Sequence, residues 1–174
     1  MSALARYFKY VDKNVMGYDR TQSPITNALE QKGIKVYFED TVSLIPESFG
    51  NTNNTLVVYT PAVPDSHSQL QYFKRNGFEV KKRSEVLGII TKDTFCFAVA
   101  GTHGKTTTSS MIVHLLKTAG IDCTGFLGGI ATNYGTNMIL NDAAESVAVI
   151  EADEFDRSFL TLYPDTAVVT AIDA

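Results

Sequence analysis

Cysteine is scarce in this 174-residue chain, and long apolar runs are absent from it. The two cysteines, Cys96 and Cys123, lie in apolar surroundings without Cys-x-x-Cys spacing, so we expect a reduced, cytoplasmic protein rather than a disulfide scaffold. No apolar run approaches the roughly 20 residues of a membrane helix, and the opening MSALARYFKYVDKN lacks the apolar segment of a secretory signal. We therefore expect no membrane insertion, and one domain or two small ones.

Acidic and basic residues are unevenly divided along the chain, although its net charge is only −4. The first 91 residues carry 11 basic and 9 acidic side chains, whereas residues 92–174 carry 4 basic and 10 acidic ones. An acidic C-terminal part argues against nucleic acid as the main partner, and it suits a site for divalent metal ions.

Predicted helices and strands alternate along the chain, which indicates the α/β class. In the first part, strands are predicted at 14–18, 34–38, 55–60 and 78–81, between helices at 3–10, 24–31, 66–76 and 84–90. In the second part, a long helix at 105–119 accompanies strands at 94–100, 121–126, 147–150 and 167–169. The apolar strands at 55–60, 94–100, 147–150 and 167–169 are expected to be buried. Because the charge balance changes near residue 91, we predict domains over residues 1–91 and 92–174.

A phosphate-binding loop is predicted between the strand at 94–100 and the long helix. Its residues are Gly101, Thr102, His103, Gly104, Lys105, Thr106 and Thr107. Glycines let the backbone bring N–H groups close to phosphate oxygens, and the helix N-terminus adds a favourable dipole. Lys105 can reach the β- and γ-phosphates of ATP, and the Thr106 hydroxyl can bind Mg²⁺. The general pattern has glycine at the position of Val99, so this loop is a shorter GxxGKT variant.

Carboxylates gather directly after the strand at 147–150. Glu151 stands at the strand end, and Asp153, Glu154 and Asp156 follow it. Since ligands bind at the carboxyl ends of parallel strands, we predict that Glu151 binds Mg²⁺. The other three acids are equally well explained as a solvated acidic loop.

These motifs and their order resemble the Mur ligases. The resemblance is carried in the second part by GTHGKTT, LGG, EADE-x-D-x-SF-L-x-L-x-P and A-x-V-T-x-I-D. In the first part it is carried by MSALARYF, GYDRTQSPIT, VVYTPAVP and KKRSEVLG. The family more often reads EADESDASF, so Phe155 and Arg157 depart from its pattern, and these two side chains could alter contacts near the sugar or lactyl group.

The resemblance implies a Rossmann-like parallel-sheet domain for a UDP-sugar, followed by part of a P-loop ATPase α/β domain. The family's glycine-rich fingerprint would precede Met1, and its histidine after the I-D-x-D stretch would follow Ala174. A C-terminal domain that helps to bind the amino acid would also follow. We therefore expect this chain to be a segment of a longer ligase.

The implied reaction is the ATP-dependent ligation of L-alanine to the lactyl carboxylate of UDP-N-acetylmuramate through an acyl phosphate, in peptidoglycan precursor synthesis. Lys105 would hold the β- and γ-phosphates, and Thr107 would support the loop. Thr106 would bind the Mg²⁺ that bridges these phosphates, and Glu151 would bind a second Mg²⁺ that organises the carboxylate and the acyl phosphate. His103 would lie between the loop and the substrate, although a purely packing role is the alternative.

The positions that the resemblance assigns to the substrate stand at or near predicted strand ends: Asp19, Thr60, Ala62, Arg83, Ser84, Gly128 and Gly129. A Rossmann-like domain places a ribose-binding acid where Asp19 stands. Gly128 and Gly129 either pass close to a ligand or form an ordinary turn. For the other positions a surface role is as well founded, and His67 and His114 are expected to be structural.

Two other functions stay open. The first is a sibling ligase that joins a whole tripeptide to UDP-N-acetylmuramate, because it shares the loop and the acidic motif. The second is a module that binds nucleotide without turnover. No feature of the sequence indicates an oligomeric state.

Overall fold

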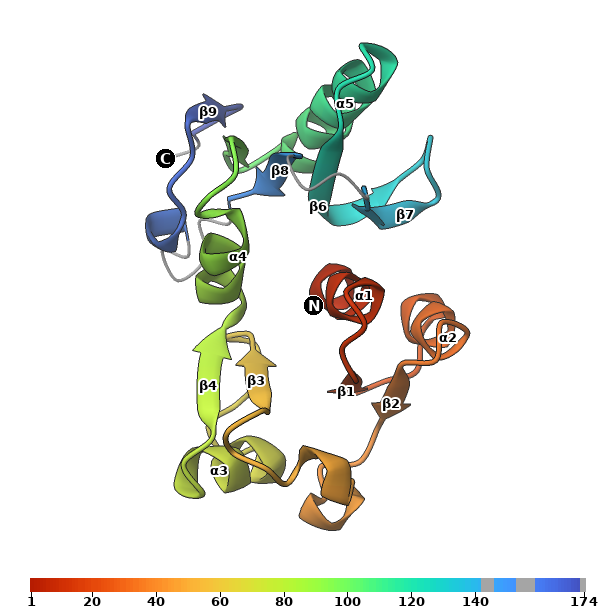
Figure 1. Cartoon of the computed structure of the whole chain (residues 1–174), viewed down its shortest axis with the longest axis vertical. Helices are drawn as coiled ribbons and strands as arrows, with labels where there is room; N and C mark the ends of the chain where they lie inside the picture. Colours follow the sequence, from red (N-terminus) through yellow and green to blue (C-terminus); the bar gives the residue numbers. More distant parts are fainter. Residues whose placement is uncertain (142–145, 153–158, 173–174) are drawn as a thin grey trace. The chain divides into compact units, whose positions relative to one another are not determined.

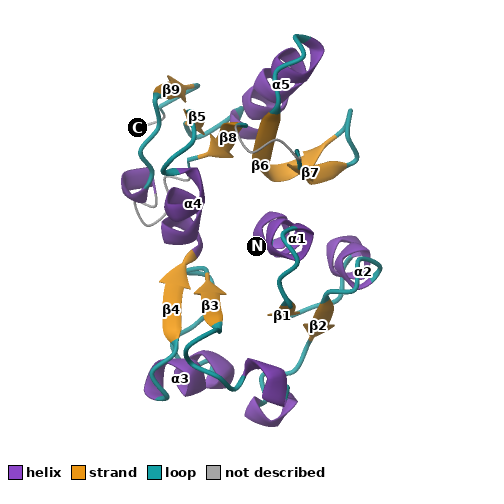
Figure 2. Cartoon of the chain, in the orientation of Figure 1, coloured by secondary structure: helices purple, strands orange, loops and turns teal. Residues whose placement is uncertain are grey.

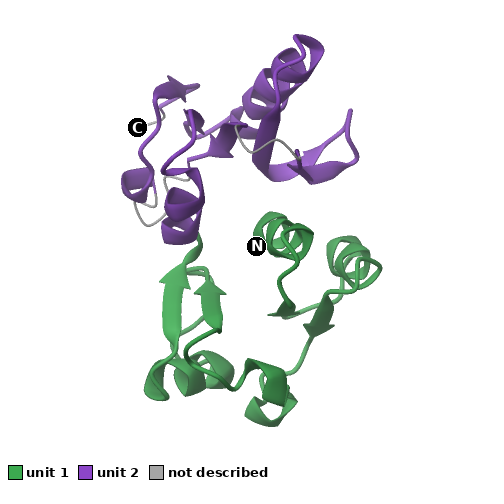
Figure 3. Cartoon of the chain, in the orientation of Figure 1, with its two compact units in different colours: residues 1–83 green, residues 84–174 purple. Residues whose placement is uncertain are grey.

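A computed structural model of the chain describes residues 1–141, 146–152 and 159–172. The chain forms two compact units, Met1–Arg83 and Ser84–Ala174 (Figure 3). Helix α4 (Arg83–Thr91) begins where the first unit ends. The Thr161 carbonyl oxygen packs directly against Gly88 of this helix, and a Cβ at position 88 would overlap that oxygen. A domain boundary after residue 91 stays a prediction.

Two pairs of parallel strands form the sheets of the first unit (Figure 2). Strand β1 (Met16–Tyr18) pairs with β2 (Lys35–Tyr37), and β3 (Leu56–Tyr59) pairs with β4 (Glu79–Lys82). The helices that accompany them are α1 (Ser2–Tyr10), α2 (Pro24–Glu30), α3 (Ser68–Arg75) and short 3-10 helices at Val42–Leu44 and Glu47–Phe49.

Helix α2 shows how local sequence sets its own boundaries. The Ser23 hydroxyl accepts from the Thr26 N–H at 3.2 Å, while the Thr26 hydroxyl accepts from the Ser23 N–H at 2.8 Å. This reciprocal capping box, with Pro24 in the first turn, starts the helix where the sequence predicts it. After the helix, Gly33 adopts a φ of +74°, and the chain then buries Leu29, Ile34 and Val36 together.

Strand β3 is less buried than its apolar sequence predicts. Leu56 is 38% exposed, and the other residues of the strand are half-buried. Among the described residues, β3 pairs only with β4, so neighbouring strands cover one of its edges rather than two.

The second unit is built on a sheet with the strand order β7-β6-β8-β5-β9 in the described residues. Its strands are β5 (Cys96–Ala100), β6 (Cys123–Ala131), β7 (Thr136–Ile139), β8 (Val147–Glu151) and β9 (Thr166–Val169). Strand β5 lies between β8 and β9 and is parallel to both (Figure 2). Cys96 and Val99 of β5 are completely buried, as predicted.

Helix α5 (Lys105–Thr118; Figure 1) follows β5 and contributes to the core of this unit through Val113. The core joins Val113 of the helix to residues of three strands: Cys123, Leu127, Ala131, Ile139 and Val149. Its apolar contacts provide most of the stabilisation that the unit can draw on. None of the helices described combines the length and the apolar character that crossing a membrane requires.

Three expectations for this unit were wrong. Strand β9 is not buried, because it is the outermost strand of the sheet that the described residues form, and Val169 is 57% exposed. Strand β6 does not end at residue 126 but continues to Ala131, so Gly128 and Gly129 lie inside a strand rather than after one. The antiparallel partner of β6, β7, was not predicted, since its sequence TNMI has no marked alternation.

Candidate functional site

Two glycines shape the loop between β5 and α5. Gly101 has a φ of +127°, and a Cβ at this position would overlap the Thr170 hydroxyl. Gly104 has a φ of +81° and is the N-cap of α5. Other residue types rarely adopt such angles, so both positions require glycine. The strand, loop and helix therefore have the form that a phosphate-binding loop needs.

Lys105 lies over this loop. Its Nζ donates a hydrogen bond to the Gly101 carbonyl, four residues earlier in the chain. The N-cap Gly104 offers no side chain to the first N–H groups of α5, and no acidic residue stands in the first turn. A cation and a helix N-terminus thus meet at one place, which suits an anion.

Glu151 joins three parts of the site. It is the last residue of β8, only 7% exposed, and pairs in register with Val99 of β5. Its Oε1 accepts from the Gly128 N–H at 2.7 Å, and its Oε2 accepts from the Thr106 hydroxyl at 3.1 Å. The structure therefore brings Glu151, Thr106 and Gly128, from three different elements, together at the carboxyl end of the parallel strands.

The glycine pair of β6 makes room for these side chains. A Cβ on Gly128 would overlap Glu151 Oε2 and lie 3.1 Å from its Cδ. A Cβ on Gly129 would lie 3.3 Å from the Thr106 methyl. Close approach of protein side chains accounts for both glycines, and contact with a substrate stays a prediction for them.

The donor atoms of Glu151 and Thr106 fit Mg²⁺. Both supply oxygen, and Mg²⁺ in nucleotide sites takes one or two protein oxygens while phosphates and water complete its shell. Among the residues that the structure describes, no cluster of three or more His, Cys, Asp or Glu side chains is placed to hold a metal. Five residues that the sequence analysis singled out lie outside the described ranges: Asp153, Glu154, Phe155, Asp156 and Arg157.

The remaining loop residues differ in their surroundings. The Thr102 N–H donates to the Ala171 carbonyl at 3.1 Å, and the His103 carbonyl accepts from the Thr170 hydroxyl. The side chains of His103 and Thr107 are exposed, so His103 is not a core residue. Thr170 was not among the predicted site residues. It comes directly after β9, at the same end of the parallel strands as Glu151, and this position could have identified it from the sequence.

The substrate positions predicted in the first unit, and Ser84 at the start of the second, lie after strands, as expected. Asp19 follows β1, where its N–H donates to the Tyr37 carbonyl at 3.0 Å. Thr60 and Ala62 follow β3 on the other strand pair. Arg83 and Ser84 open α4 directly after β4, and Ser84 is buried. Their contact with a substrate stays a prediction.

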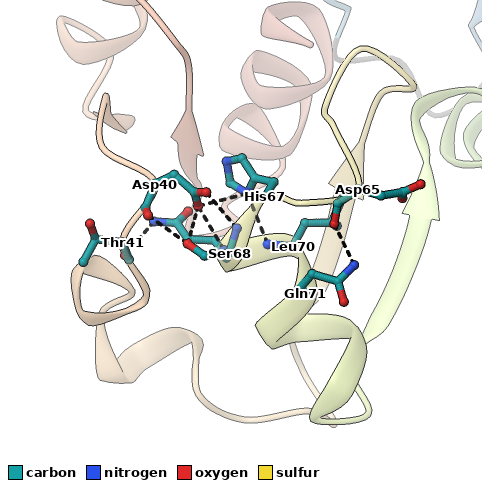
Figure 4. A network of polar contacts seen from close by, with 8 residues as sticks. Asp40, Thr41, Asp65, His67, Ser68, Leu70 and Gln71 are labelled. Carbon is teal, nitrogen blue, oxygen red and sulfur yellow. Dashed lines mark hydrogen bonds and ion pairs between the residues drawn. The ribbon is translucent and has the colours of Figure 1, made fainter.

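A polar network in the same unit centres on Asp40 (Figure 4). Its carboxylate accepts from the Ser68 N–H at 2.7 Å, the Ser68 hydroxyl at 2.6 Å and the Gln69 N–H at 3.1 Å. Partial burial alone would raise the pKa of the Asp40 carboxyl, but these hydrogen bonds lower it. The network fastens the segment after β2 to the first turn of α3.

His67 has the structural role expected of it. Its Nδ1 accepts from the Leu70 N–H at 3.3 Å, which caps α3, and also lies 3.2 Å from Asp40 Oδ1 (Figure 4). Its ring meets the Tyr18 ring edge-on with 4.4 Å between centroids. Within the described residues, Nε2 is buried without a hydrogen-bond partner. His114 lies on α5 beside Tyr134, also away from the loop.

Comparison with known proteins matches the whole length of this chain. Over 174 residues it is 59% identical to the UDP-N-acetylmuramate–L-alanine ligase of Flavobacterium johnsoniae, and over 173 residues it is 56% identical to that of Parabacteroides distasonis. The chain spans 38% and 37% of the length of these two curated relatives.

Two solved structures share the fold. A UDP-N-acetylmuramate:L-alanyl-gamma-D-glutamyl-meso-diaminopimelate ligase from Neisseria meningitides is 26% identical, with a TM-score of 0.89 over 99% of this chain and 57% of its own. A UDP-N-acetylmuramate-alanine ligase from Thermotoga maritima is 27% identical, with a TM-score of 0.87 over 100% of this chain and 39% of its own.

The family assignment follows from both parts of the chain. Residues 1–94 match the Mur ligase family, catalytic domain, and residues 99–174 match the Mur ligase middle domain. The glycine loop, Lys105 and Glu151 all lie in the second of these matches. This chain is a member of the Mur ligase family.

Proposed function

We propose that this chain forms the nucleotide-binding part of an enzyme that ligates L-alanine to the lactyl carboxylate of UDP-N-acetylmuramate with ATP. The observation that carries the proposal is that Thr106 of the glycine loop and Gly128 of β6 both donate to Glu151, at the carboxyl end of the parallel strands. The 59% identity to a ligase of that activity selects this reaction among those of the family. The free thiols Cys96 and Cys123 fit a cytoplasmic location.

The loop is the site for ATP in this proposal. Residues 101–107 contribute backbone N–H groups and the dipole of α5 toward the phosphates. Lys105 exchanges the Gly101 carbonyl for β- and γ-phosphate oxygens, which carry more negative charge and therefore attract the ammonium more strongly. Charge neutralisation is the largest contribution that this loop makes, because the reaction brings a carboxylate to a phosphate.

Thr106 and Glu151 are the residues that would hold Mg²⁺. When bound, the ion supplies positive charge to the phosphate oxygens during transfer. The Thr106 hydroxyl donates to a Glu151 oxygen at 3.1 Å, so the two oxygens that would hold Mg²⁺ lie side by side in the site. Gly128 keeps the other carboxylate oxygen fixed through its N–H.

The reaction proceeds in two steps. A lactyl carboxylate oxygen attacks the γ-phosphorus and ADP leaves, which gives an acyl phosphate. The uncharged alanine amine then attacks the acyl carbon, the C–O bond breaks, and the amine loses a proton as phosphate leaves. His103, with its exposed side chain on the loop, is placed on the substrate side of the nucleotide in this proposal.

In this proposal the site for the UDP-sugar lies within residues 1–91. Asp19 would bind the ribose, and Thr60, Ala62, Arg83 and Ser84 would contact the rest of the nucleotide or the sugar. His67 Nε2 is buried and has no hydrogen-bond partner in the part of the chain that the structure describes, and the His67 ring lies beside Tyr18 at the end of β1, which supports a ligand at this place. A polar atom left without a partner inside a protein costs about 1–3 kcal/mol, which a ligand could recover.

Amine specificity is the decisive test. The complete protein that contains this chain is assayed with UDP-N-acetylmuramate, Mg·ATP and either L-alanine or L-alanyl-gamma-D-glutamyl-meso-diaminopimelate. The proposal expects product with L-alanine. Turnover with the tripeptide alone would favour the activity of the Neisseria relative, whose fold is equally similar.

A binding module without turnover is the second candidate, and the 38% coverage of the relative favours it for the 174 residues alone. Calorimetric titration of this chain with Mg·ATP and with UDP-N-acetylmuramate tests it. Binding of both ligands without phosphate release would assign the module function to the chain. Phosphate release by the chain itself would reject it.

A further inference from the structure

Residues 170 and 171 lie against the phosphate loop, and the proposed function gives them no role. The Thr170 N–H donates to the Ala100 carbonyl at 3.0 Å, which continues the pairing of β9 with β5 (Figure 2). The Thr170 hydroxyl lies within hydrogen-bond distance of the Ala100 and His103 carbonyls. The Ala171 carbonyl accepts from the Thr102 N–H at 3.1 Å. The end of β9 thus contacts the loop at its beginning and its end.

These bonds decide which way two peptide groups of the loop face. In a trans peptide, the C=O and the following N–H point to opposite sides. The Thr102 N–H points to Ala171, and the Gly101 C=O of the same peptide points away from it, to Lys105 Nζ. Likewise the His103 C=O points to Thr170, so the Gly104 N–H points to the opposite side. Lys105 Nζ and the Gly104 N–H therefore both lie on the side away from β9.

We propose that Thr170 is a positioning residue for the phosphate loop. By holding the His103 carbonyl on the β9 side, its hydroxyl keeps the Gly104 N–H on the side of Lys105, where an anion would bind. A flip of this peptide would put a carbonyl oxygen toward the phosphates, which repels them. This inference rests on the proposed binding of ATP by the loop.

Thr170 packs against the two glycines of the loop. A Cβ on Gly101 would overlap the Thr170 hydroxyl, and a Cβ on Gly104 would lie 3.8 Å from Thr170 Cβ. The threonine thus fills the space that the glycines leave. A valine at position 170 keeps this shape but lacks the donor, and a serine keeps the donor but lacks the methyl group.

The test measures Mg·ATP binding to the complete protein by titration calorimetry for wild type, Thr170→Val, Thr170→Ser and Thr166→Val. Thr166 is the first residue of β9, four residues before Thr170, and is the matched control. We expect Thr170→Val to raise the Kd for Mg·ATP about 3- to 10-fold, the loss of one hydrogen bond. Thr170→Ser and Thr166→Val should stay within about twofold of wild type, and the Kd for UDP-N-acetylmuramate should not change in any variant.

The outcomes separate the two proposals. If wild type binds Mg·ATP and Thr170→Val binds it with the same Kd, Thr170 has no positioning role. If Thr170→Val lowers only the fraction of protein that binds and leaves the Kd unchanged, its role is structural and the positioning proposal fails. If wild type itself does not bind Mg·ATP, the proposed function fails, and this inference fails with it.

Discussion

Replacing Gly128 with alanine tests how tightly Glu151 is held. The new Cβ would overlap Glu151 Oε2 and lie 3.1 Å from Cδ, so the carboxylate has to move. Glu151 is only 7% exposed and lies at the end of a strand in the middle of the sheet, so it has little room to move. Its bond from the Gly128 N–H, 2.7 Å long, would be broken or lengthened.

The size of the effect follows from that bond. A hydrogen bond to a charged group is worth about 1.5–3 kcal/mol. If the same bond holds Glu151 in the transition state, its loss slows ligation about 10- to 150-fold, since each 1.36 kcal/mol is a factor of ten. Gly129→Ala should do less, because its Cβ would lie 3.3 Å from a methyl group that can shift.

The assay is the ligation rate of the complete protein, together with its urea unfolding midpoint. Gly17→Ala is the control for the glycine-to-alanine change itself. Among the described residues, no atom beyond the two chain neighbours lies within 4 Å of a Cβ on Gly17, so its midpoint should change little or rise slightly. A Gly128→Ala enzyme with wild-type rate and midpoint would refute the reasoning that Gly128 holds Glu151 in place.

Three further predictions concern single side chains. Glu151→Ala should slow ligation more than it weakens ATP binding, and added Mg²⁺ should partly restore the rate; failure of both would remove Glu151 from the metal site. Burial raises the pKa of the Cys96 thiol to about 11, so native protein at pH 8 should leave Cys96 unlabelled by iodoacetamide, as mass spectrometry would show. The lowered pKa of Asp40 stabilises the fold above the carboxyl's unfolded pKa near 4 and ceases to do so as pH falls through the lower folded value. Asp40→Asn should therefore flatten the pH dependence of unfolding below about pH 5, and an unchanged profile would contradict this.

Local sequence predicted those parts of the fold that local chemistry determines. Ser23 and Pro24 start α2, and the apolar run before Gly101 forms a strand with parallel neighbours on both sides. The form of the loop was predictable because its glycines, its lysine and the helix that follows are all typical of one structure, a phosphate-binding loop. The place of Glu151 in the site was predictable because the carboxyl ends of parallel strands lie at the same end of the sheet.

Other features depend on contacts between segments far apart in sequence. Gly128 lies inside β6 because Glu151, 23 residues later, needs its space, and no local pattern shows this. The apolar sequence of β9 predicts burial, but the strand forms an edge in the described sheet. Thr170 contacts the loop from 67 residues away, and only the sheet order brings it there.

Transfer of an oxygen atom tests the account most directly. The complete protein is given UDP-N-acetylmuramate with ¹⁸O in both lactyl carboxylate oxygens, together with Mg·ATP and L-alanine. An acyl phosphate requires one of these oxygens to bond to the γ-phosphorus and to leave with it. The account predicts one ¹⁸O atom in each phosphate released, read by mass spectrometry. Phosphate without ¹⁸O would contradict it.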